Sequence, residues 1–168
     1  MVLSRLMLSA LCGTAVALTA TGVATAATTY TDSVTGVEYY ATSTQGRFSG
    51  TASGDLPGAW AATVNHTVLS PSGTVTGGEM TLATTLNGTP TLLDGDVTGG
   101  QVARTNPGAT GCVNQYYAVT LTVGNVTANG GGSGSGSFAG TLTHHRRSVF
   151  GRCLTYGATI NGGLSLAI

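Results

Sequence analysis

The fold class is decided by the stretch Gly134-Ser-Gly-Ser-Phe-Ala-Gly-Thr-Leu-Thr-His-His-Arg146. From Phe138 to His144, every second residue is apolar, glycine or histidine, and the residues between them are alanine or threonine. A period of two is the pattern of a β-strand that buries one face. The stretch therefore predicts a strand whose inner face carries Phe138, Gly140, Leu142, His144 and Arg146.

The same alternation recurs along the chain, which contains no lysine and few of the residues that populate helix surfaces. No window has the 3.6-residue period of an amphipathic helix. We therefore expect an all-β chain, with turn signals rich in Gly, Pro and Asn between most strands. The expected strands lie near residues 36–43, 46–53, 59–69, 74–85, 90–104, 115–127, 135–146 and 154–167.

Eight strands with short links predict an antiparallel up-and-down meander, closed as a barrel or, as the alternative, folded as a β-sandwich. Closure is favoured because it removes exposed strand edges, which a chain with so few charges cannot easily protect. We expect a single β domain over residues 36–168, preceded by a loose N-terminal lead over residues 27–35.

Glycines punctuate the strands in a recurrent form, Gly-x-apolar-small-Gly. Glycines in the middle of strands permit bulges, tight curvature or the close approach of another segment, and a small barrel needs such kinks. The form occurs at Gly46-Arg-Phe48-Ser-Gly50, Gly73-Thr-Val75-Thr-Gly77, Gly95-Asp-Val97-Thr-Gly99 and Gly136-Ser-Phe138-Ala-Gly140.

Two segments carry a resemblance to known barrels. Gly46-Arg-Phe-Ser-Gly-Thr-Ala-Ser-Gly and Gly134-Ser-Gly-Ser-Phe-Ala-Gly-Thr-Leu resemble the Gly-x-Phe-x-Gly strands of the allene oxide cyclase and dirigent barrels. The chain as a whole also resembles small secreted actinobacterial proteins of unknown function. The resemblance implies a barrel and transfers no catalytic residue.

Residues 1–26 have the composition of a cleavable, helical signal peptide for the general secretory route. One positive charge, Arg5, precedes an apolar stretch that decays into small residues and ends at Ala24-Thr-Ala26, a small-x-small cleavage pattern. Ser, Thr and Gly interrupt the stretch, so it falls short of the ~20 apolar residues of a membrane span. We therefore expect a secreted, extracellular protein with no membrane span after cleavage.

Two cysteines remain beyond the expected signal peptide, Cys112 and Cys153. A single pair in an exported chain predicts a structural disulfide bond. Closing a loop of about 40 residues stabilises a fold by roughly 4 kcal/mol in the chain-entropy model.

The charges beyond residue 26 nearly cancel, because five arginines stand against six acidic residues and leave a net charge of about −1. On this balance the chain has no electrostatic reason to seek nucleic acid or anionic lipid. We expect no nucleic-acid partner, no cofactor and no metal.

Strand alternation brings four candidate ligand-binding residues, Trp60, His66, Tyr117 and His144, to the inner face. An apolar face that carries histidines and aromatic rings predicts a cavity with polar anchors. In the alternative, His66 is a satisfied core or rim histidine and His144 marks the point where its strand reaches water. The apolar neighbours on these faces are Ala62, Val64, Val68, Val119, Leu121, Val123, Phe138 and Leu142.

Acidic residues offer two further hypotheses. Glu79 could join His66 and His144 around a metal ion, although no zinc signature is present. Asp94 and Asp96 would lie on one face of a strand, as an acid–base pair or a calcium site, or would mark a hairpin corner.

The one dense polar cluster is His144-His-Arg-Arg147. Adjacent histidines on a strand point to opposite faces, so His144 and His145 cannot chelate one ion without a bulge. Arg146, Arg147 and Arg152 could bind an anionic ligand or form the solvated end of a strand and its loop.

These observations favour a non-enzymatic, secreted β-barrel that binds a small molecule, or a cell-envelope or host component, through one barrel mouth. The second hypothesis is a cyclase- or isomerase-type enzyme that uses the same cavity, with His66 or Glu79 as general base. The third is a structural or self-associating surface protein. The sequence leaves the oligomeric state open.

Overall fold

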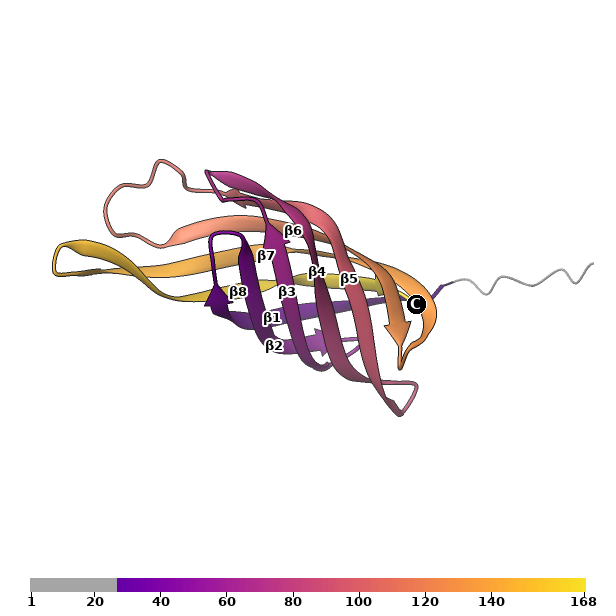
Figure 1. The fold of residues 1–168 in the computed structure, drawn as a ribbon. Coiled ribbons are helices and arrows are strands. Elements are labelled where there is room, and N and C mark those ends of the chain that lie inside the picture. Colours follow the sequence, from indigo (N-terminus) through magenta and orange to yellow (C-terminus); the bar gives the residue numbers. More distant parts are fainter. Residues whose placement is uncertain (1–26) are drawn as a thin grey trace, which may run out of the picture.

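The computed structural model describes residues 27–168, which form one closed antiparallel barrel (Figure 1). Each strand pairs with its neighbours in sequence order, and β1 closes the barrel against β8. No helix within residues 27–168 has the length and hydropathy needed to cross a membrane. The strands are β1 (Thr29–Ala41), β2 (Gln45–Gly54), β3 (Gly58–His66), β4 (Ser72–Leu86), β5 (Thr89–Arg104), β6 (Gln115–Ala128), β7 (Gly131–Val149) and β8 (Arg152–Ala167).

The up-and-down barrel predicted from the sequence is confirmed, and the alternative sandwich is wrong. Residues 29–35, expected as a loose lead, instead form the first half of β1, where they pair with β8 and bury Asp32 and Val34. The expected signal peptide, residues 1–26, lies outside the described residues.

The third strand is shorter than expected. It ends at His66 instead of residue 69, and its register against β4 shifts between Asn65 and His66. The N–H of Thr67 then donates to the carbonyl of Thr74 across the loop (2.9 Å). Residues 67–69 therefore belong to the rim of the barrel and not to its wall.

The meander places the connections alternately at the two ends of the barrel. The β1–β2, β3–β4, β5–β6 and β7–β8 connections share one end, which we call the hairpin end. The remaining connections lie at the opposite end, which we call the termini end because Thr28 and Ile168 pair there. The long hairpin of β7 and β8 extends well beyond the other strands at the hairpin end (Figure 1).

The termini end of the barrel is filled by leucine side chains. Leu56 in the β2–β3 connection is buried with Leu82, Leu93 and Leu166. Two aspartates hold this connection in place: Asp32 Oδ1 accepts from the N–H of Leu56 (2.9 Å), and Asp55 Oδ2 accepts from the N–H of Thr31 (2.8 Å). The connection thus closes this end of the barrel with apolar side chains.

Inward aromatic rings lie against glycines. A methyl group built on Gly36 would come within 2.7 Å of the Trp60 ring, and one on Gly140 or Gly162 would overlap the ring of Phe138. Gly36 pairs with Gly50, and Gly140 pairs with Gly162. Glycines at these positions therefore leave room for large rings inside a narrow barrel, as glycine kinks do in curved sheets.

Three hairpins have two-residue turns in which both residues have positive φ. Two of these turns are Asn87-Gly88 and Asn129-Gly130, the residue pair that suits this geometry best. The third is Phe150-Gly151, at the tip of the β7–β8 hairpin, with φ of 49° at Phe150. The left-handed region costs a residue with a large side chain roughly 1–2 kcal/mol.

A disulfide bond joins Cys112 and Cys153, as predicted (S–S 2.01 Å). It ties the β5–β6 connection to the projecting β7–β8 hairpin. The N–H of Arg146 also donates to Oδ1 of Asn114 in the same connection (3.1 Å). The projecting part of the hairpin is therefore held from one side.

The close approach of the β1 backbone to Gly50 predicts that Gly50→Ala destabilises the barrel. The added methyl group would overlap the carbonyl oxygen of Thr35 on β1, and crowding of this kind costs roughly 1–3 kcal/mol. Urea unfolding would measure the loss. The control is Gly163→Ala on β8, where no atom lies within 4 Å of the new methyl group; equal losses for the two variants would contradict the steric explanation.

Candidate functional site

The half of the barrel nearer the hairpin end is hollow. A cavity of about 280 Å³ lies there, and its wall is mostly apolar. Residues of the β1–β2 and β3–β4 connections also line it, which places its mouth at the hairpin end. The wall is formed by Val34, Glu38, Ala41, Thr42, Ser43, Phe48, Trp60, Ala62, Val64, His66, Val68, Leu69, Met80, Val97, Val102, Val119, Leu121, Val123, Phe138, Leu142, His144, Ile160 and Leu164.

Three of the four residues predicted to bind a ligand line this cavity: Trp60, His66 and His144. Tyr117 is buried but does not line the wall. Its ring packs against that of His144, with 5.0 Å between ring centroids, and its hydroxyl donates to Oε1 of Gln115 (3.2 Å). Tyr117 therefore positions His144 and has no direct access to the cavity.

A carboxylate meets His144 at the cavity wall. Nε2 of His144 lies 3.2 Å from Oε2 of Glu38, and the side chains are 18% and 9% exposed. The pair meets across β8, because Glu38 and His144 are both cross-strand partners of Ala158, whose small side chain separates them very little. Gly46 leaves space for the carboxylate, since a methyl group there would lie 2.6 Å from Oε1 of Glu38.

The Glu38–His144 contact does not satisfy the imidazole. Nε2 of His144 is buried, and no group among residues 27–168 forms a well-aligned hydrogen bond with it. A buried polar atom without such a partner is uncommon in folded proteins. The ring of His144 lines the cavity, whereas Nε2 itself is shielded from it beside the Glu38 carboxylate.

His66 supplies a second polar group at the rim. Its Nδ1 lies 2.8 Å from the carbonyl oxygen of Thr67. A carbonyl only accepts, so this hydrogen bond requires the proton on Nδ1. Nε2 is then the ring nitrogen through which His66 can contact a ligand.

Trp60 contributes an apolar surface. Its Nε1–H is shared between the carbonyl oxygens of Thr35 and Thr51, each at 3.2 Å. The polar edge of the indole is thus engaged with the backbone of β1 and β2. The ring is therefore part of the apolar wall and not a hydrogen-bond donor to a ligand.

The acidic residues that the sequence suggested for a site, Glu79, Asp94 and Asp96, lie on the outer face of the barrel. Glu79 is exposed on the outer face of β4, so it can neither share a metal ion with His66 and His144 nor act as a base in the cavity. Asp94 and Asp96 lie in the middle of β5, not at a hairpin corner, and Asp96 Oδ2 accepts from Nδ2 of Asn125 (2.7 Å). Within residues 27–168, no three His, Cys, Asp or Glu side chains converge in a way that could hold a metal ion.

His144 and His145 point to opposite faces of the sheet, as expected for adjacent residues on a strand. His144 faces the cavity, whereas Nε2 of His145 lies 3.0 Å from Oγ1 of Thr159 on the other face of the sheet. Arg146, Arg147 and Arg152 belong to the projecting hairpin and do not line the cavity.

Sequence reasoning missed Glu38. A signal was present, because Val34, Gly36 and Glu38 alternate along one strand face. It was hidden by treating residues 27–35 as a lead, which removed Val34 from the pattern. Once β1 is extended to Thr29, alternation alone places Glu38 inside the barrel.

The fold and site define a small eight-stranded antiparallel barrel, filled at one end and hollow at the other, with an imidazole–carboxylate pair in the wall. Comparison of the chain with protein-family models, with curated proteins and with solved structures gives no match.

The contact between His144 and Glu38 predicts a selective effect of Glu38→Gln. This change keeps the side-chain size but removes the charge beside Nε2 of His144, so the ring resonances of His144 should shift in NMR spectra. Those of His145 should not, because its partner is Thr159. Unchanged His144 signals would show that the pair does not form.

Proposed function

We propose that this protein binds a small, largely apolar molecule in the barrel cavity, with Glu38, His66 and His144 as the polar contacts near the mouth. The cavity carries this proposal. Its volume of about 280 Å³ exceeds the ~150 Å³ of an engineered apolar cavity that takes up benzene. An apolar wall with a few convergent polar groups is the usual composition of a small-molecule site.

The polar groups would set the orientation of the ligand. A hydroxyl group at one end of the molecule could contact Nε2 of His66, the ring nitrogen that is not engaged with Thr67. The rest of the molecule would lie against Trp60, Phe48 and Phe138. A role in capture or transport of such a molecule outside the cell would fit the secretion expected from residues 1–26.

Blocking the cavity tests the proposal. In Ala62→Phe, a ring grows into the cavity from β3, so the affinity for N-phenylnaphthylamine, a neutral fluorophore that brightens in apolar surroundings, should fall roughly tenfold or more, a loss of about 1.4 kcal/mol or more. Fluorescence titration would measure it. The matched control is Ala59→Phe, on the exposed face of the same strand, which should bind like the parent chain.

Substitution of His66 and His144 tests whether these side chains contact the ligand or only stabilise the fold. His66→Ala and His144→Ala should preserve the melting temperature within a few degrees while weakening a probe that carries a hydroxyl group. A large fall in melting temperature without any effect on binding would assign both histidines to the framework. No fluorophore binding by the parent chain would refute the ligand site altogether.

A second candidate is an isomerase-type enzyme that uses the same cavity. The Glu38–His144 pair favours it, because a carboxylate and an imidazole against an apolar wall can together remove and return a proton. Glu38 takes the place of Glu79 as the candidate base, with His66 as a further one.

The enzymatic candidate predicts that the protein catalyses exchange of the α-hydrogens of a small cyclic ketone with deuterium in heavy water. Glu38→Gln should slow this exchange by ~100-fold or more, whereas Glu79→Gln, on the outer face, should leave it unchanged. Mass spectrometry of the ketone follows the reaction. Exchange no faster than in buffer would leave ligand binding as the proposed function.

A further inference from the structure

We propose that the tip of the β7–β8 hairpin, residues 146–156, docks onto an anionic lipid surface. The tip lies outside the barrel cavity, and this inference does not depend on the cavity binding a ligand. It rests on a strained and fully exposed phenylalanine, on the distribution of arginines and acids, and on the way the hairpin is held.

Phe150 is the central observation. Its side chain is 102% exposed, so nothing in the described residues packs against it. Its φ of 49° lies in the left-handed region, where the two equivalent turns of this chain have Asn87 and Asn129. A bulky apolar residue that is strained and makes no contact does not serve the fold, and such outliers are a reason to look for function.

Other apolar side chains extend the exposed surface of the tip. Leu154 and Tyr156 are exposed on β8, next to the apex. The guanidinium of Arg147 lies over the Tyr156 ring, 5.4 Å from its centroid. Apolar and cationic groups are thus combined on one narrow segment.

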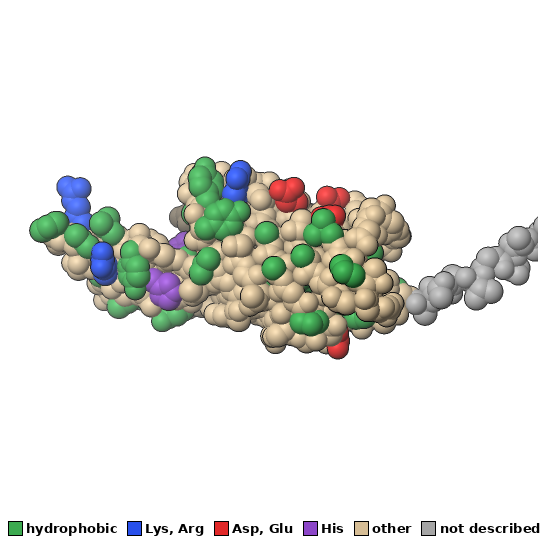
Figure 2. All heavy atoms as spheres, turned by 90° about the horizontal axis from the view of Figure 1, so that it is seen from below, with side chains coloured by type: hydrophobic (Ala, Val, Ile, Leu, Met, Phe, Trp, Pro, Cys, Tyr) green, Lys and Arg blue, Asp and Glu red, His purple; other side chains and the backbone are tan. Residues whose placement is uncertain are grey.

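The charges of the chain are segregated along the sequence. Residues 27–96 carry all six acids and one arginine, Arg47, whereas residues 97–168 carry four arginines and no acid. Three of those four, Arg146, Arg147 and Arg152, lie on the tip. Figure 2 shows arginines on the projecting hairpin and acidic side chains on the barrel body. The near-zero net charge therefore conceals a cationic end, and the expectation that anionic lipid is no partner came from averaging over both halves.

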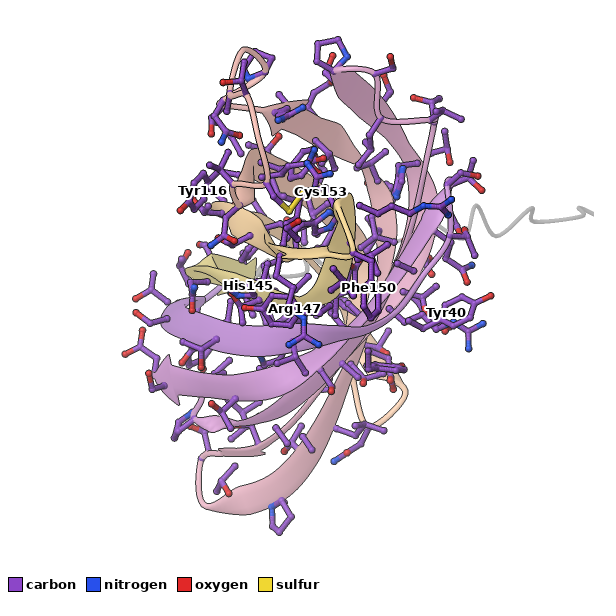
Figure 3. The ribbon with its side chains drawn as sticks, turned by 90° about the vertical axis from the view of Figure 1, so that its left-hand side faces the viewer. Tyr40, Tyr116, His145, Arg147, Phe150 and Cys153 are labelled. Carbon is purple, nitrogen blue, oxygen red and sulfur yellow. A yellow bond between two sulfur atoms is a disulfide. The ribbon has the colours of Figure 1, made fainter. Side chains whose placement is uncertain are left out.

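The tip is presented in a defined direction. The disulfide bond from Cys153, close to the apex, to Cys112 and the hydrogen bond from the Arg146 N–H to Asn114 hold the tip from one side. Figure 3, which looks onto the barrel from the hairpin end, shows Phe150 and Arg147 on the projecting segment and Cys153 beside them. An apex held away from the barrel can reach a surface before the barrel does.

A lipid surface fits this tip better than a protein partner does. A stable protein interface covers about 800 Å² on each side, which calls for a broad face, whereas this tip is a two-stranded point. Entry of a few apolar side chains below the lipid headgroups, with nearby cations on anionic headgroups, is a known mode of peripheral attachment. Phe150 would enter the interface while Arg146, Arg147 and Arg152 stay at the level of the phosphates.

Vesicle cosedimentation of residues 27–168, which contain the whole barrel, tests the proposal. The chain should bind vesicles of phosphatidylglycerol mixed with phosphatidylcholine, should bind phosphatidylcholine alone much more weakly, and should dissociate as salt rises. Phe150→Asn should lower the affinity roughly tenfold or more, because one buried ring is lost. The same change converts the turn to Asn-Gly, so the melting temperature should be equal or higher, and a folding defect cannot explain the loss.

The contribution of the tip arginines to vesicle binding can be tested against a matched control, Arg47, elsewhere in the chain. Arg147→Gln should weaken vesicle binding about fivefold. Arg47→Gln, which removes a guanidinium that likewise lies over a tyrosine ring (Tyr40, 5.2 Å), should have little effect because Arg47 lies outside the tip.

Two outcomes would overturn the proposal: no binding to anionic vesicles, or equal binding by the parent chain and Phe150→Asn. If vesicle binding is absent but the chain is retained on heparin, the tip binds a soluble polyanion instead. Binding of N-phenylnaphthylamine, measured without vesicles, should be unchanged in Phe150→Asn and Arg147→Gln. A failure of the cavity proposal is therefore distinguishable from a failure of this one.

Discussion

The rings of Trp60 and Phe138 lie against strand positions where only glycine fits, and the shape of the barrel depends on that contact. A small barrel has little interior volume, so a large inward ring needs a neighbour without a side chain. Gly36 provides this space beside Trp60, and Gly140 and Gly162 provide it beside Phe138. The rings form apolar walls while the strands curve tightly enough for β1 to reach β8.

The two ends of the interior differ because different residue sizes face inward there. At the termini end, Leu56 folds into the barrel with Leu82, Leu93 and Leu166, and leaves no room for a ligand. Toward the hairpin end, Ala62 and the valines of the wall are too small to fill the interior, and a cavity remains. The small side chain of Ala158 allows Glu38 and His144 to meet across β8.

The charged side chains on the outer surface are also distributed unevenly between the barrel body and the β7–β8 hairpin. The acidic residues belong to β1, β4, β5 and the β2–β3 connection, whereas most arginines lie on the β7–β8 hairpin. A uniform net charge is therefore a poor description of this molecule. The electrostatic field near the hairpin is that of its arginines, because at physiological ionic strength charges farther than about 8 Å are largely screened.

The sequence by itself determined the strand count, the disulfide pair and the face of each strand on which Trp60, His66 and His144 lie, because these follow from local alternation and from cysteine number. Only the tertiary structure decided that the interior is half hollow, that Glu38 meets His144, and that Phe150 contacts nothing. Alternation fixes which face a side chain occupies but not its height along the barrel. That height is set by strand stagger and by the bulges between paired strands, which are properties of the closed sheet as a whole.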